Sequence, residues 1–294
     1  MSALTAVSSR VKAYRRRLGS STRLLFGVYL PVKDRLRCIK DPRLLLLHRR
    51  LARHLARQKA EWKHAYTYNY YYQGFERIGI GGAKPSERRL EHYQILEYLK
   101  PSHRVLDIGS NCGFFALNLA RYVASVEGIE LNPHLNRIAC DTRDWLGIRN
   151  ATFRTADFVA EPLRESYDIV FSLSNHHTID GNLSVGFGAY IQKIFDHMSP
   201  GGMLFFESHN VWGDGKLGPG DDSDLDAKFD IAEQYFELVK HKMVRCFYPS
   251  ADIDKLFIVL RRRPARDPSA RRRLTLEAAR KSYQYVCFEA QPHG

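Results

Sequence analysis

The chain has 294 residues, of which 44% are hydrophobic and 26% are charged, a composition typical of globular proteins that excludes the fibrous, disordered and membrane-embedded classes. The formal charge of +13 is concentrated at the two ends. Residues 1–65 contain 17 basic and three acidic residues, residues 261–294 contain nine basic and three acidic ones, and the part between them is mildly acidic. Basic ends of this kind attract phosphate, in RNA or at an anionic membrane surface.

The N-terminal third predicts helices and a turn. Residues 41–59 repeat leucine at spacings of three and four with arginine on the other faces, the pattern of a basic amphipathic helix. Such a helix packs on the main domain, or it docks on a membrane surface or on nucleic acid. After the aromatic stretch 66–75, a glycine-rich turn leads to Ser86, a suitable N-cap for a helix to about residue 99.

The rest of the chain alternates strands and helices. Short apolar segments predict strands at residues 103–108, 125–130, 151–155, 167–174 and 203–208. Helical patterns lie between them, so we expect a parallel, doubly wound α/β sheet whose chemistry lies at the carboxyl ends of the strands. After a Gly- and Asp-rich loop at 210–226, a helix over 227–239 and two strand-like runs at 242–249 and 254–262 predict an antiparallel hairpin.

The cysteines and the apolar segments bear on the compartment. The five cysteines are scattered and contain no CxxC pair, which predicts neither a disulfide framework nor a structural zinc site. The apolar run at 24–31 is much shorter than the roughly 20 residues that span a bilayer. We expect a cytoplasmic protein that could also lie peripherally at a membrane, although the acid-free first 33 residues also fit an organelle transit peptide.

The most specific motif lies at residues 105–115. A strand ends at Asp107, the chain turns through Gly109 and Gly113, and a helix begins. Glycines let the backbone approach a ligand closely, and the helix start offers unpaired N–H groups. A nicotinamide dehydrogenase would need G-x-G-x-x-G to hold pyrophosphate, whereas D-x-G-x-x-x-G places a carboxylate that repels pyrophosphate and suits a cationic amine.

A second acid, Glu130, follows Asp107 by 23 residues at the end of the next predicted strand. It can accept hydrogen bonds from both hydroxyls of a ribose. The two acids favour a nucleoside with a cationic amino-acid tail, the shape of S-adenosylmethionine; the alternative is that both only cap turns. With these residues the chain resembles the class I, Rossmann-like S-adenosylmethionine-dependent methyltransferases over residues 85–260.

The resemblance implies a mostly parallel seven-stranded sheet with an antiparallel C-terminal hairpin. We expect the methyltransferase domain at residues 66–261, a basic helical extension at 1–65 and a flexible basic tail at 262–294, which is too charged and proline-rich to pack. The segment 71–89 is loosely similar to methyltransferases of surface-polysaccharide synthesis and of tRNA wobble-uridine modification.

The family also implies roles for single residues. Ser110 and Asn111 would line the methionine part of the cofactor. Asp157 would lie by the adenine amino group with Phe158 beside the ring, although Asp after a strand is also common turn chemistry.

The segment before the motif could cover the cofactor. Tyr72 and Arg88 are candidates to contact its carboxylate, which Arg binds in a planar fork. The alternative is an ordinary packing helix on which Arg88 and Arg89 are solvated.

The fourth predicted strand ends in Ser-Asn-His-His, on the side that faces the transferable methyl group in this family. A hydroxyl acceptor must lose a proton as it attacks, so His176 or His177 is the candidate base; the alternative is that both only cap the strand. Glu207 and His209 could converge with them, but no metal site is predicted. The [DN]-P-P-[YFW] tetrad of methyltransferases acting on base or amide nitrogens is absent, which favours an oxygen acceptor.

These features predict an S-adenosylmethionine-dependent O-methyltransferase acting on a sugar or another hydroxylated small molecule. An RNA or tRNA methyltransferase whose basic ends hold phosphates is one alternative. A non-catalytic module that binds the cofactor is another. The partners that the sequence suggests are a methyl-acceptor substrate and, through the basic ends, an anionic membrane surface or RNA.

Overall fold

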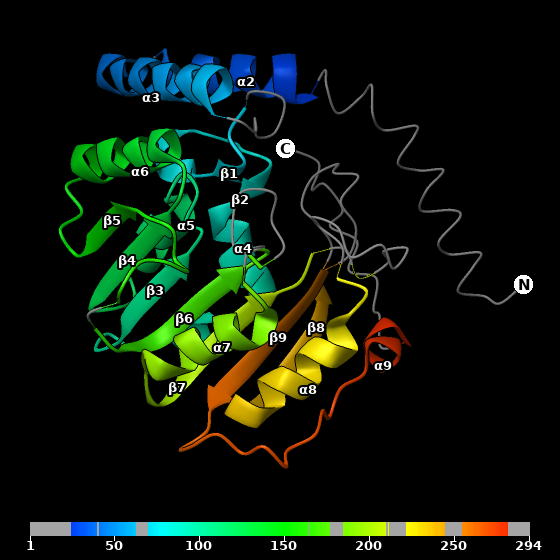
Figure 1. The fold of residues 1–294 in the computed structure, drawn as a ribbon. Helices are drawn as coiled ribbons and strands as arrows, with labels where there is room; N and C mark the ends of the chain where they lie inside the picture. Colours follow the sequence, from blue (N-terminus) through cyan, green and yellow to red (C-terminus); the bar gives the residue numbers. More distant parts are fainter. Residues whose placement is uncertain are drawn as a thin grey trace, which may run out of the picture.

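A computed structural model of the chain gives the fold (Figure 1). It describes residues 25–39, 41–62, 70–163, 165–176, 185–209, 211, 222–244 and 255–281. These residues form a seven-stranded sheet in the order β5-β4-β3-β6-β7-β9-β8, in which β9 runs antiparallel to β7 and β8 and the other neighbours are parallel. The predicted doubly wound sheet with an antiparallel C-terminal hairpin is therefore confirmed.

Five of the seven strands lie close to their predicted positions, whereas β7 begins five residues and β8 six residues earlier than predicted. The seven strands are β3 (Arg104–Ile108), β4 (Ser125–Glu130), β5 (Ala151–Thr155), β6 (Tyr167–Leu173), β7 (Met198–Glu207), β8 (Phe236–Val244) and β9 (Lys255–Arg262).

Two hydrophobic cores lie on the two faces of the sheet, because side chains alternate along each strand. On one face Phe171, Phe205 and Phe257 stack across β6, β7 and β9, with ring centroids 4.8 and 6.1 Å apart. Their neighbours Val170 and Leu204 belong to the core of the other face. Both faces are therefore apolar and covered by helices.

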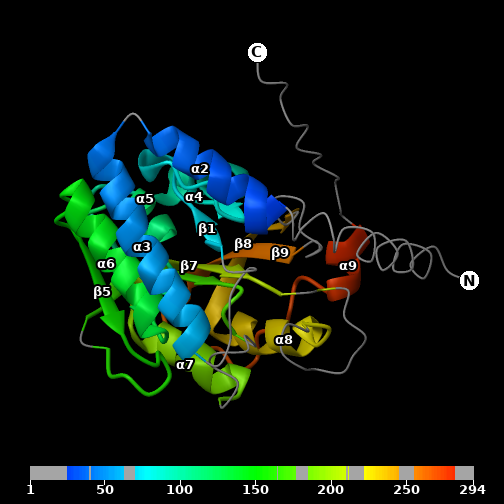
Figure 2. The same ribbon diagram turned by 90° about the horizontal axis from the view of Figure 1, so that it is seen from above.

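Helices cover both faces of the sheet (Figures 1 and 2). One side carries α4 (Ser86–Tyr93), α5 (Phe114–Leu119) and α6 (Pro133–Leu146), and the other carries α7 (Phe187–Asp196), α8 (Leu225–Tyr235) and the short α9 (Leu276–Lys281). None of the described helices is both long and apolar enough to cross a bilayer.

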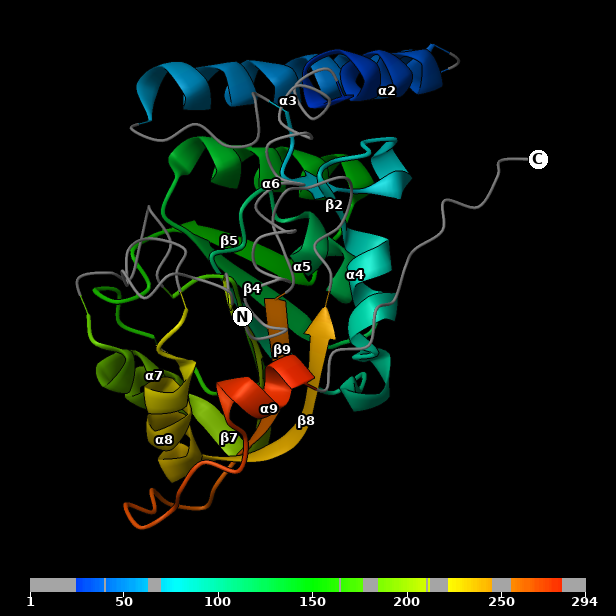
Figure 3. The same ribbon diagram turned by 90° about the vertical axis from the view of Figure 1, so that its right-hand side faces the viewer.

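The N-terminal helices form a separate layer outside α6 (Figure 3). A π-helical turn (Leu25–Tyr29) leads into α2 (Leu30–Cys38), and α3 (Pro42–Glu61) begins where the Asp41 side chain accepts hydrogen bonds from two backbone N–H groups. Leu47, Leu51 and Leu55 are buried, and α3 packs on α6. The basic amphipathic helix therefore packs its leucines on the main body.

The segment between α3 and β3 is short and irregular. Strands β1 (Gln73–Gly74) and β2 (Lys84–Pro85) pair in parallel. Ser86 does not cap α4 as predicted: its buried hydroxyl donates to the carbonyl of Gly74 at 2.7 Å. The helix also ends earlier than expected, because Gln94 adopts a left-handed conformation with φ of 52°, and a 3-10 turn (Leu96–Tyr98) follows.

Two predictions at the C-terminal end are corrected. The helix expected to reach residue 239 ends at Tyr235, because β8 begins at the next residue and pairs with β9. The tail, expected to be flexible, packs over its described part 263–281: Leu274 and Leu276 are buried in the second core, and Arg263 donates to the backbone carbonyl of Glu233 at 2.9 Å. Glu233 and Asp230 on α8 form ion pairs with Arg263 and Arg272 of the tail. These pairs offset the positive charge from which the flexible tail was predicted. Residues 282–294 lie outside the described chain.

Candidate functional site

The glycine loop between β3 and α5 needs its glycines. Gly109 and Gly113 have φ of 68° and 70°, a region that side chains rarely adopt. A Cβ on Gly109 would lie 2.9 Å from the Asn175 side-chain oxygen, and one on Gly113 would lie 2.4 Å from the Cβ of Ala139. Asn111 between them also takes a positive φ of 55°. The loop is thus held tightly against the ends of β6 and α6.

Gln73 fixes this loop from the N-terminal segment. Its side-chain oxygen accepts the N–H groups of Phe114 at 2.8 Å and Phe115 at 3.3 Å, and its amide donates to the carbonyl of Ser110 at 3.1 Å. Gln73 therefore satisfies the open end of α5. This role of Gln73 could not be predicted from the sequence, since a single Gln in an aromatic stretch gives no signal of its partners.

Asp107 lies at the carboxyl end of β3 and is only 3% exposed. Its Oδ2 atom is buried and makes no hydrogen bond to any described residue, and the same holds for the Ser110 hydroxyl. Burial raises the pKa of Asp107 to about 7, with Arg89 opposing the rise and Glu130 adding to it. A buried carboxylate oxygen without a donor is suited to a cationic amine.

Glu130 lies at the end of the neighbouring strand β4. Its two oxygens accept the backbone N–H groups of Asn111 and Asn132, each at 2.8 Å. Glu130 therefore caps two turns, and these hydrogen bonds orient its carboxylate beside the glycine loop. Each carboxylate oxygen accepts more than one hydrogen bond, so Glu130 could also receive the hydroxyls of a ribose.

Asp157 and Phe158 follow β5. Asp157 is half-buried, and its carboxylate accepts the N–H of Val159 at 2.9 Å, which is turn chemistry. Phe158 is buried, with its ring edge against Tyr190 at 5.4 Å between centroids. An adenine-binding role for this pair stays a prediction.

The segment before the glycine loop presents a different arginine from the one expected. Arg88 is exposed on α4, whereas Arg89 is 3% exposed and its charge acts on Asp107. The alternative in which Arg89 is solvated is wrong, because α4 turns this residue inward. Tyr72 is half-buried with the Lys84 ammonium 5.0 Å from its ring centre.

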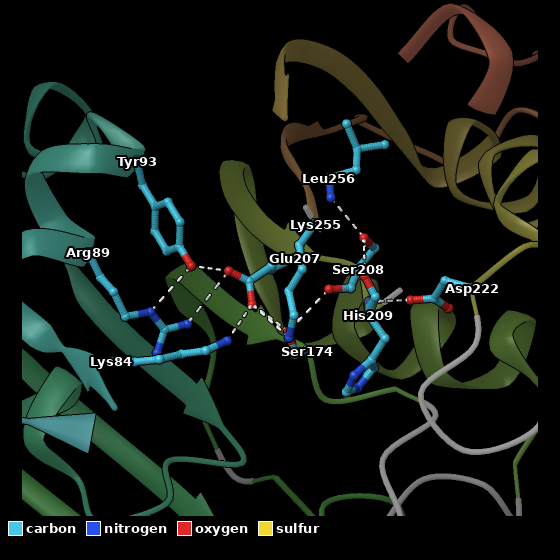
Figure 4. Close-up of polar contacts among 10 residues, drawn as sticks. All are labelled: Lys84, Arg89, Tyr93, Ser174, Glu207, Ser208, His209, Asp222, Lys255 and Leu256. Carbon is cyan, nitrogen blue, oxygen red and sulfur yellow. Dashed lines mark hydrogen bonds and ion pairs between the residues drawn. The ribbon is translucent and has the colours of Figure 1, made fainter. Parts of the chain in front are cut away.

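A buried polar network surrounds Glu207 at the end of β7 (Figure 4). The hydroxyls of Tyr93 and Ser174 donate to its carboxylate. Three cations from separate segments surround the same carboxylate, at 3.9, 3.9 and 3.7 Å: Lys84, Arg89 and Lys255. Burial alone would raise the pKa of Glu207, but these cations hold it well below its usual range.

The acceptor side lies at the ends of β6 and β7. His176 is buried, with its ring 5.1 Å from the rings of both Phe187 and Tyr190. Asn175, the residue before it, lies against Gly109. His177 lies outside the described residues.

His209 is half-buried beyond Glu207, and desolvation lowers its pKa well below the usual value, with Lys255 and Lys84 adding to the effect. The arrangement does not support a metal ion held by Glu207 and the histidines. The Glu207 carboxylate is already surrounded by cations, which would repel a metal ion. Within the described part of the chain, no group of three or more His, Cys, Asp or Glu side chains is placed to hold a metal.

Comparison with known proteins assigns the chain to a family. The family described as "Methyltransferase domain" matches residues 85–257, more than half of the chain. The chain belongs to this family. It is a class I, Rossmann-like S-adenosylmethionine-dependent methyltransferase.

Individual relatives are more distant. Over 60 residues the chain is 38% identical to a protein-L-isoaspartate O-methyltransferase of Picosynechococcus, a match covering 20% of this chain and 27%, about a quarter, of that protein. Among solved structures, the N-methyltransferase NodS of Bradyrhizobium japonicum in complex with S-adenosyl-L-homocysteine is 20% identical, with a TM-score of 0.49 over 60% of this chain and 88% of that one. A methyltransferase of Aquifex aeolicus is 18% identical, with a TM-score of 0.47 over 62% and 95%.

Proposed function

We propose that this methyltransferase transfers its methyl group to an oxygen of a hydroxylated acceptor, such as a sugar, and that His176 receives the acceptor proton. The observation that carries the proposal is the position of His176, which is held between Phe187 and Tyr190 directly after Asn175, the residue that contacts the glycine loop. A histidine fixed at this strand end can take a proton near neutral pH.

The cofactor would lie across the ends of β3 and β4. Asp107 would bind its amine, because the buried Oδ2 has no other donor among the described residues. Glu130 would accept the ribose hydroxyls while Asn111 and Asn132 keep its carboxylate in place. Ser110 and Asn111 would line the methionine part. S-adenosylmethionine supplies a methyl group on a positively charged sulfur, which an acceptor oxygen can attack.

The carboxylate of the cofactor would be bound from the N-terminal segment. We assign this role to Arg89 and not to Arg88, because Arg89 is buried beside Asp107 whereas Arg88 is exposed. Tyr72 remains a second candidate through its position next to Lys84. Asp157 and Phe158 are proposed to border the adenine.

Two observations support oxygen as the acceptor atom. The strand end reads Ser-Asn-His-His and lacks the tetrad used on base and amide nitrogens. The curated relative from Picosynechococcus is named as an O-methyltransferase, although it matches only a fifth of this chain. Catalysis would then rest mainly on holding the acceptor oxygen in line with the methyl group, with His176 accepting the proton.

The acceptor class can be tested by incubating the protein with S-adenosylmethionine labelled in its methyl group and with lysate fractions. We expect alkali-stable label in glycans or small hydroxylated molecules. Label lost as methanol in alkali would indicate a carboxylate and contradict a hydroxyl acceptor, and label released by ribonuclease would identify RNA as the acceptor in place of a glycan or small molecule. Cofactor binding without transfer to any fraction would instead identify a non-catalytic binding module.

The role of His176 can be tested in the variant His176→Gln, which keeps a polar side chain of similar size. We expect methyl transfer to fall about a hundredfold or more, because the proton has no acceptor, while the affinity for S-adenosylmethionine stays close to that of the unmodified protein. His241→Gln on the edge strand β8 is the matched control. Normal turnover in His176→Gln would remove this residue from the mechanism.

A further inference from the structure

Apolar side chains are exposed on the outer side of α2. Val32, Leu36 and Ile39 are 49%, 61% and 68% exposed, and they follow one another at spacings of four and three, so they share one helix face. The buried residues of the same helix, Leu30, Asp34 and Cys38, lie on the opposite face. One turn earlier, Val28 and Tyr29 are also more than half exposed. Large exposed apolar residues grouped on one face mark an interaction surface.

The outer side of α3 carries arginines. Its buried side consists of Leu47, Leu51 and Leu55, and the opposite side exposes basic residues together with Leu46, which is 63% exposed. The exposed basic residues opposite the leucines are Arg49, Arg53 and Arg57, and Arg43 and Arg50 are exposed along the flank of the helix. Only Arg50 forms an ion pair with an acid of the described chain, Asp141, at 3.7 Å. The cationic charge of this side is therefore largely uncompensated within the described residues.

These two sides belong to one layer. Figures 1 and 3 show α2 and α3 in one outer layer with α6 beneath α3, and Figure 2 shows that the two helices lie close at one end and diverge from it. We call the exposed residues Val32, Leu36, Ile39, Leu46, Arg43, Arg49, Arg50, Arg53 and Arg57 the outer helical face. It combines an apolar stripe with a row of arginines on neighbouring helices.

We propose that the outer helical face docks this methyltransferase onto an anionic lipid bilayer. The apolar stripe of α2 would enter the boundary between headgroups and acyl chains, and the arginines of α3 would lie against lipid phosphates, as in helices that bind in the plane of a membrane. The proposal concerns where the enzyme works, and it does not depend on the identity of the acceptor.

Charge and chemistry favour a bilayer over other partners. A second copy that used the same face in a symmetric dimer would bring the two arginine rows together, and like charges would repel. RNA would satisfy the arginines but would leave the valine, leucine and isoleucine stripe without an apolar partner. An anionic bilayer satisfies both parts of the face.

The test is sedimentation of the full-length protein with vesicles of phosphatidylcholine alone or mixed with phosphatidylglycerol. We expect binding to the mixed vesicles that weakens as salt increases. The triple variant Val32→Ser/Leu36→Ser/Ile39→Ser should lose at least about tenfold in binding, because the buried apolar area is lost. The matched control is Leu96→Ser/Trp145→Ser/Val239→Ser, which removes exposed apolar residues outside this face and should bind normally.

A second pair of variants tests the arginines. The variant and its control lose the same number of positive charges, so they have equal net charge. Arg49→Gln/Arg53→Gln/Arg57→Gln should bind about fivefold more weakly for each arginine removed. The control Lys100→Gln/Arg149→Gln/Arg261→Gln removes the same charge from exposed positions elsewhere and should bind nearly as well as the unmodified protein. Thermal unfolding and cofactor affinity, measured on every variant, should be unchanged, because all replaced side chains are exposed.

Several results would overturn the proposal. One is absence of binding to anionic vesicles by the unmodified protein, and another is equal loss in a variant and its matched control. A third is a defect confined to binding of an RNA oligonucleotide, which would assign the face to RNA. A fourth is loss of self-association in analytical ultracentrifugation without any effect on vesicles, which would assign it to a second copy of the chain.

Discussion

Asp107 is a buried residue whose ionisation we expect to link the stability of this protein to cofactor binding. Its carboxylate is nearly inaccessible, and burial raises its pKa to about 7, with Arg89 opposing this effect. The charged form is therefore poorly stabilised by the protein alone. We expect a cationic ligand to supply the missing partner, so that binding and ionisation of Asp107 are coupled.

This coupling predicts a pH dependence of cofactor affinity. Below about pH 7 Asp107 is protonated, and the affinity for S-adenosylmethionine should fall by up to tenfold for each pH unit; above about pH 8 it should level off. Isothermal titration between about pH 6 and about pH 8 measures this. In Arg89→Gln the midpoint should move upward, because the cation that favours the charged carboxylate is gone. A flat profile in the unmodified protein would contradict the role given to Asp107.

The variant Asp107→Asn separates binding from folding. The folded pKa lies above the unfolded value near 3.8, so the folded state holds the proton more tightly, and its stability falls as the pH rises from about 4 to about 7. The amide does not ionise. At pH 8 the free energy of unfolding of the cofactor-free variant should therefore be higher by up to about 4 kcal/mol, and the variant should bind no cofactor. Loss of binding together with lower stability would indicate simple misfolding.

At the scale of elements, the glycine loop depends on close contacts as well as on backbone conformation. Gly113 and Gly147 have almost the same φ, 70° and 65°. They differ in their surroundings: a Cβ on Gly113 would collide with Ala139 and Phe153, whereas nothing lies within 4 Å of one on Gly147. The pair therefore separates backbone strain from steric overlap.

Replacing each of these glycines by alanine tests this separation. Gly147→Ala should cost about 1 kcal/mol, the price of a left-handed conformation with a side chain. Gly113→Ala should cost about 3 kcal/mol more and should weaken cofactor binding, because α5 must move away from α6. Chemical denaturation measures both. Equal effects of the two substitutions would show that contact with Ala139 and Phe153 does not constrain the loop.

At the scale of the whole molecule, Glu207 joins segments that are distant in sequence. The cations around it come from β2, α4 and β9, and its hydroxyl donors come from α4 and the end of β6. In the same way, Asp34 of α2 accepts hydrogen bonds from Tyr70 and from the backbone of Gly81. These buried polar contacts hold the N-terminal segment in register with the carboxyl edge of the sheet.

The Glu207 network predicts a specific acid sensitivity. Because the folded pKa of Glu207 is depressed, its stabilising contribution is present above its ordinary value of about 4.5 and is lost as the pH falls below it. Glu207→Gln should lower the free energy of unfolding at pH 7 by about 3 kcal/mol, because three buried cations lose their anion. It should also flatten the acid limb of the stability curve. Glu165→Gln, in the exposed pair with Arg104, should change little.

The sequence alone predicted the elements and the cofactor motif. The alternation of apolar runs and helical patterns determines the strands, since each element carries its period locally. Asp107, Gly109, Gly113 and Glu130 could be recognised because a strand, a turn and a helix start follow one another within a short stretch, and the family match bears out the class of cofactor.

Only the tertiary structure decided which side chains face one another. Gln73 gave no signal in the sequence, and the buried cations and hydroxyls around Glu207 were not predicted, because the partners of these two residues lie 33 to 123 residues away in the chain. The choice of Arg89 over Arg88 depends on the rotation of α4, and the packing of the basic tail depends on acids of α8 that are distant in sequence. Local pattern specifies the period of an element, whereas its neighbours and its rotation are determined by the packing of the whole chain.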